Sequence, residues 1–131
     1  MRQLLEARSV LEVAAARLAA DRATPEVAAD LRAALVVEES LGSAAQRFMP
    51  VHHRLAAATG NRLFELFVDV MGDLVPSRVR TDRRTPEGIA ALSVEVHHAH
   101  DRIVEAIVAG DADVAERRML RHLEASVEAL E

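Results

Sequence analysis

Three histidines in the chain have the residue type and setting of metal ligands. His52, His100 and His122 each lie on the apolar face of a different predicted helix. Neutral imidazole is a common ligand for zinc, nickel, copper and iron. The chain contains no cysteine, so thiolate ligands and disulfides are excluded. A single histidine on a core face is usually structural, and periodicity alone leaves open whether these three are structural or share one site.

Arg8 is a fourth candidate, because it falls on a face that should be buried. It lies one turn after Leu4 and one turn before Leu11. Burying a guanidinium is costly unless it finds an anion or other acceptors. One interpretation is an ion pair with a glutamate of a neighbouring helix. The other is a clamp for the carboxylate of a ligand, which the planar guanidinium suits geometrically.

The elements that must position these side chains are helices. Alanine, leucine and valine dominate the apolar half of the chain, and no strand-like alternation appears. Thr24-Pro25-Glu26 and Thr85-Pro86-Glu87 are helix-start signals. Pro50 should kink or restart the helix that carries His52. The pattern predicts about six helices in an all-α antiparallel bundle, near residues 1–20, 25–40, 43–58, 61–76, 85–110 and 111–130.

Composition narrows the class of protein. A length of 131 residues fits one domain, 1–131, with a single core. The formal net charge of −5 argues against direct binding of nucleic acid by this chain. No signal peptide and no apolar run of membrane-spanning length is found, so the expected location is the cytoplasm, without membrane contact.

Four segments, in order, resemble the FCD ligand-binding domain, the C-terminal effector domain of FadR-subfamily GntR transcription regulators. Residues 52–61, HHRLAAATGN, resemble the signature FH-x-x-L-x-x-A-[ST]-GN. Residues 100–111, HDRIVEAIVAGD, resemble H-x-x-I-x-x-A-I-x-x-GD. The run 119–122, MLRH, is similar to the closing M-x-x-H, and residues 4–12 to the first helix of the family. The resemblance extends over nearly the whole chain.

This resemblance implies an antiparallel bundle that encloses a ligand and metal cavity. In many family members an aspartate and three histidines hold a divalent metal that helps to bind a small organic acid effector. By residue match, His52, His100 and His122 take the histidine positions. Arg8 matches a first-helix arginine that contacts the effector carboxylate. The domain would also form a homodimer and control an attached DNA-binding domain.

The chain departs from the family pattern at the aspartate ligand. That position, one turn before His52, is occupied by Phe48, which cannot coordinate a metal. Three histidines with water can still hold zinc, and zinc or nickel is therefore expected rather than an oxygen-preferring ion such as Mg²⁺. Weaker binding, a metal completed by the effector and an empty site are the open alternatives. A complete regulator would also carry an N-terminal winged helix-turn-helix, which is expected to be absent from this chain, so DNA would be contacted only by that domain.

Two other functions compete with effector sensing, and the chain is expected not to be an enzyme. A metal-dependent enzyme could use the Glu-x-x-His element Glu95–His98, but di-iron bundles need a second copy, and none is found. A hydrolase would need a general base near the metal, and no inward-facing carboxylate stands out in the sequence. A purely structural dimerisation module is the remaining alternative.

Overall fold

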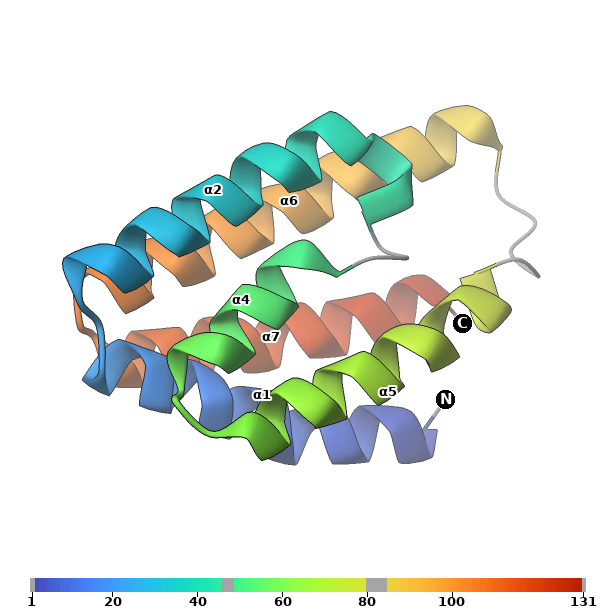
Figure 1. Cartoon of the computed structure of the whole chain (residues 1–131). Helices are drawn as coiled ribbons and strands as arrows, with labels where there is room; N and C mark the ends of the chain where they lie inside the picture. Colours follow the sequence, from blue (N-terminus) through green and yellow to red (C-terminus); the bar gives the residue numbers. More distant parts are fainter. Residues whose placement is uncertain (1, 46–48, 80–84, 131) are drawn as a thin grey trace.

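The chain is all-helical in a computed structural model that describes residues 2–45, 49–79 and 85–130 (Figure 1). Over these ranges it forms six α-helices and one short 3-10 turn, η1. The helices are α1 (Arg2–Asp21), α2 (Pro25–Leu41), α4 (Pro50–Ala58), α5 (Arg62–Val79), α6 (Pro86–Val108) and α7 (Ala112–Leu130), with η1 at Gly42–Ala44. The described residues contain no strand, and the predicted all-α class is confirmed.

The predicted helix starts are confirmed by their caps. The Oγ1 atom of Thr24 accepts a hydrogen bond from the backbone N–H of Val27 at 3.1 Å, and Thr85 does the same for Gly88 at 3.1 Å. A proline occupies the first turn of each helix that follows, where its missing N–H costs nothing. Asn61 and Asp111 cap α5 and α7 in the same way. Local side-chain chemistry therefore sets where these four helices begin.

Two prolines were expected to set helix boundaries, and only one of them does. Pro50 restarts the helix that carries His52, as predicted, because α4 begins at Pro50 and follows Met49, whose φ of 47° is left-handed. Phe48 lies outside the described residues. The fourth helix does not end at Pro76, since α5 continues to Val79. Proline removes only one backbone hydrogen bond, and the other bonds of this 18-residue helix maintain its path.

The helices pack in pairs around a core built largely from alanine. α1 lies along α7, α2 lies along α6, and α4 crosses between the pairs (Figure 1). Ala15, Ala16 and Ala19 of α1 and Ala115 of α7 are fully buried, and such small side chains let helix axes approach closely. α1, α2, α4, α6 and α7 thereby converge on one interior region. No described helix is both long and apolar enough to span a membrane.

Candidate metal centre

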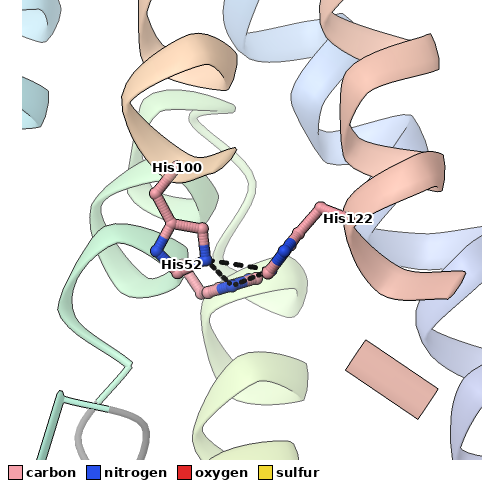
Figure 2. Close-up of side chains that lie close together, drawn as sticks. All are labelled: His52, His100 and His122. Carbon is pink, nitrogen blue, oxygen red and sulfur yellow. Dashed lines mark hydrogen bonds between the residues drawn. The ribbon is translucent and has the colours of Figure 1, made fainter. Parts of the chain in front are cut away.

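His52, His100 and His122 come together in the interior of the bundle (Figure 2). They project from α4, α6 and α7, and all three are buried. The Nε2 atom of His100 lies 3.0 Å from that of His52 and 2.9 Å from that of His122. The third side of the triangle, between His122 and His52, measures 3.4 Å. Three different helices thus aim the same ring nitrogen at one point.

Two buried glutamates orient two of these rings from behind. Glu12 of α1 accepts a hydrogen bond from Nδ1 of His52. Glu38 of α2 accepts one from Nδ1 of His100 at 2.5 Å. A proton on Nδ1 leaves the lone pair on Nε2, facing the centre of the cluster. Carboxylate–histidine pairs of this kind commonly surround metal sites, where they fix the tautomer of the ligand.

The spacing of the three nitrogens suits a metal ion. Zinc and similar ions bind imidazole nitrogen at about 2.1 Å, which places neighbouring ligands roughly 3.0 Å apart at 90° and roughly 3.4 Å apart in a tetrahedron. The observed separations of 2.9, 3.0 and 3.4 Å cover that interval. Converging lone pairs repel one another unless a proton or a cation lies between them. The donor set therefore fits a divalent metal held by three histidines, with further coordination positions left for other ligands.

The buried surroundings favour the neutral forms of His100 and His122 and the charged forms of the two glutamates. Burial lowers the pKa of His122 well below its usual value, and the neighbouring His100 and His52 lower it further. Burial also lowers the pKa of His100, although Glu38 acts in the opposite direction. Burial alone would raise the pKa of Glu12, but His52 and Arg8 outweigh it and hold that pKa at about 2. Neutral imidazole is the form that binds a metal.

Opposing effects also act on the pKa of Glu38. Burial acts to raise its pKa, and hydrogen bonds with His100 and His97 outweigh this and lower it. The second oxygen of Glu38 accepts from Nδ1 of His97 at 2.8 Å. His97 is therefore connected to the cluster through Glu38 rather than being a simple surface residue. His53 is different, because it pairs with Asp69 at 3.1 Å on the exposed side of α4.

Arg8 is largely buried, as predicted, but its ion-pair partner lies on its own helix. Its Nε atom donates to Glu12 Oε2 at 2.5 Å, one turn along α1, and not to a glutamate of a neighbouring helix. Glu12 thus receives Arg8 on one oxygen and His52 on the other. Arg8 also lines the cavity beside the histidines. A structural ion pair and a contact with a ligand are both compatible with this position.

Glu12 and Glu38 are the functional residues that sequence reasoning missed. The expectation that inward-facing carboxylates are scarce is wrong, since their exposed fractions are only 2% and 4%. A signal existed in the helical period. Glu12 follows Arg8 by one turn on the buried stripe of α1, and Glu38 continues the buried stripe of Leu31 and Ala34 on α2. Both carboxylates are engaged by histidine Nδ1 atoms rather than standing free as general bases.

The histidine cluster opens onto a cavity of about 590 Å³. All three histidines contribute to its wall, as do Arg8, Glu38 and His97. Its size lies within the range of about 300–1,000 Å³ that is typical of small-molecule sites. The cavity also runs along the N-terminal half of α6 and past η1. A ligand in this cavity would meet the Nε2 atoms and Arg8 together.

Similarity to known proteins agrees with this architecture. Residues 3–125 match the FCD domain. The chain is 31% identical over 130 residues to the HTH-type transcriptional regulator LutR of Bacillus subtilis (strain 168), covering 94% of this chain and 58% of that protein. It is 29% identical over 122 residues to the "Putative L-lactate dehydrogenase operon regulatory protein" of Escherichia coli (strain K12), covering 92% of this chain and 47% of that protein. The chain thus spans about half the length of these relatives. Because the match to the FCD domain covers nearly all of its residues, the chain belongs to the FCD domain family.

Proposed function

We propose that this chain is the effector-sensing domain of a FadR-type GntR transcription regulator. It binds a small organic acid in the bundle cavity, with a divalent metal held by His52, His100 and His122. The observation that carries this proposal is the convergence of three buried Nε2 atoms on a cavity that Arg8 also lines. The regulators among its relatives support the regulatory role.

The metal and Arg8 would together hold the carboxylate of the ligand. A bound metal would supply an open coordination position for one carboxylate oxygen. Arg8 carries five N–H donors in a planar fork, and only its Nε is directed to Glu12 among the interactions of the described residues. Its terminal nitrogens would bind the ligand carboxylate and offset its charge. Glu12 holds Arg8 and His52 in fixed relative positions and so connects the two parts of the binding site.

Zinc or nickel is the proposed metal. Three imidazoles suit these ions better than they suit Mg²⁺ or Ca²⁺, which prefer oxygen ligands. The family aspartate position carries Phe48 in this chain, so the histidines would hold the metal without a protein carboxylate. The metal would then rely more on water or on the effector itself to complete its coordination.

We further infer that the domain acts as a homodimer attached to a separate DNA-binding domain in the cytoplasm. Leu63, Leu66 and Val70 form an exposed apolar stripe on α5, with exposed fractions of 72%, 59% and 49%. An exposed apolar face of this kind is typical of a protein interface. Effector binding would favour one arrangement of the two subunits and hence one spacing of the attached DNA-binding domains.

The test is calorimetric titration of the domain, first after a chelator has removed any bound metal and then after zinc or nickel has been added back. We expect zinc or nickel to bind at one ion per chain, and L-lactate or another carboxylate to bind only to the loaded protein. His122→Asn should abolish metal binding, whereas His53→Asn, a matched change outside the cluster, should leave it intact. Absence of metal binding would overturn the proposal in favour of a structural module. Turnover of a substrate by the loaded domain would favour an enzyme.

A further inference from the structure

The N-terminal half of α6 carries apolar side chains that are only partly buried and that face the cavity. The buried residues of α6 all lie in its second half, from His100 to Ile107. In the first half, Ile89, Leu92 and Val96 are only partly buried, yet all three line the cavity. With Ser93 they follow the helical spacing that leads to His100, so they share its face. An apolar wall therefore leads along one helix to the histidine cluster.

Two further apolar residues line the cavity. They are Ala45 and Met49, and both are buried. Of the three serines in the cavity wall, Ser93 donates to the carbonyl of Ile89 and Ser126 to that of His122, while Ser43 lies in η1. The charged and imidazole groups of the cavity wall are Arg8, Glu38, Glu39, His97 and the three histidines of the cluster. The cavity is thus polar around the cluster and mainly apolar along α6.

The cavity is larger than a very small acid would need. A three-carbon hydroxy acid has six heavy atoms, and even at about 30 Å³ per atom, the share of a water molecule in the liquid, it takes up roughly 180 Å³. The cavity measures about 590 Å³. Such a ligand would leave most of the apolar wall in contact with water. A longer apolar ligand would cover it.

We propose that the effector is an amphipathic monocarboxylate, with its carboxylate at the His52–His100–His122 cluster and Arg8 and its apolar tail along Ile89, Leu92 and Val96. This inference rests on the proposed function, because it takes the cluster as the carboxylate-binding end. Beyond the proposed function, it specifies that the rest of the effector is an apolar tail. A medium-length aliphatic acid such as octanoate has the required form.

The first test is a chain-length series on the zinc-loaded domain. Acetate, butanoate, hexanoate and octanoate share one carboxylate and differ only in methylene groups. Full burial makes each methylene worth about fourfold in affinity, so octanoate should bind on the order of 100-fold more tightly than butanoate. Equal affinity along the series would overturn the apolar tail and leave carboxylate sensing standing. Failure of every acid to bind would overturn both proposals.

The second test changes the apolar wall without changing its charge. Ile89→Gln and Leu92→Gln should each weaken octanoate binding about tenfold and leave acetate binding within twofold. Ala91→Gln is the matched control, because Ala91 is exposed and lies outside the cavity wall on the same helix. Equal losses for octanoate and acetate would contradict the placement of the tail. Thermal unfolding of each zinc-loaded variant verifies that it is folded.

Discussion

His100 donates from Nδ1 to Oε1 of Glu38 at 2.5 Å, so a carboxylate on α2 determines which nitrogen of a histidine on α6 faces the cluster. The same carboxylate accepts from His97 through its other oxygen. Glu38 therefore positions His100 without itself facing the three Nε2 atoms. Glu12 has the equivalent relationship to His52 from α1. Two helices that supply no histidine to the cluster thus determine how two of its three rings are aimed.

Replacing Glu38 should weaken metal binding without removing a ligand. In Glu38→Gln the amide is a weaker acceptor and carries no charge, so the Nδ1 proton of His100 is held less firmly. We expect zinc affinity to fall about 10- to 100-fold, as measured by competition with a chromophoric chelator. Glu39→Gln removes the same charge from the cavity wall without a contact to His100, and its zinc affinity should stay within threefold. Equal effects of the two changes would show that cavity charge matters rather than the hydrogen bond.

Replacing Arg8 should separate carboxylate binding from metal binding. Lysine keeps the positive charge, but it lacks the planar fork that binds a carboxylate through two hydrogen bonds. For Arg8→Lys we expect the zinc-loaded domain to bind octanoate about tenfold more weakly, while zinc affinity stays within threefold. Calorimetry measures both quantities. A large loss of zinc affinity would instead mean that Arg8 acts mainly by holding Glu12 against His52.

Acid should destabilise the metal-free domain at a pH set by its histidines. The pKa values of His100 and His122 are lowered in the folded state, so the unfolded chain binds protons more readily as the pH falls. Their contribution to stability is complete above the unfolded pKa of about 6.5 and is lost as the pH drops below it. The free energy of unfolding should fall by about 1.4 kcal/mol per pH unit for each histidine.

Urea titrations of chelator-treated protein between pH 7.5 and 5 measure this slope. His122→Asn should reduce this slope, since one of the two histidines with a lowered pKa is gone. His98→Asn, a change on the exposed side of α6, should leave the slope as it is. A free energy of unfolding that stays constant over this pH range would contradict the prediction.

Thr24 tests the contribution of a helix cap to stability far from the cluster. Thr24→Ala removes the hydrogen bond from its Oγ1 to the N–H of Val27 at the start of α2. The expected cost is about 1 kcal/mol in the free energy of unfolding, from urea titration of the metal-free protein. Thr24→Ser retains the hydroxyl acceptor and should lower the free energy of unfolding by only about a few tenths of a kcal/mol. An equal loss in both variants would show that the methyl group matters instead of the cap.

The sequence by itself determined which segments form helices and which side of each helix is buried. Threonine caps, early prolines and the 3.6-residue apolar period are local signals, and they correctly predicted where α2 and α6 begin. The same period placed His52, His100 and His122 on the apolar sides of their helices, where the structure finds them buried. The family resemblance then implied that they share a cavity. These predictions succeed because each depends on residues within one or two turns of one another.

Only the tertiary structure decided how those faces meet. The separations of 2.9 to 3.4 Å between Nε2 atoms depend on the axial register of α4, α6 and α7, which is set by packing. The roles of Glu12 and Glu38 likewise emerge only when α1 and α2 are placed against the histidines. The helical period can place a glutamate on a buried stripe, but no local pattern shows which side chain it will contact. Its partner comes from a distant segment, and packing between helices determines which segment that is.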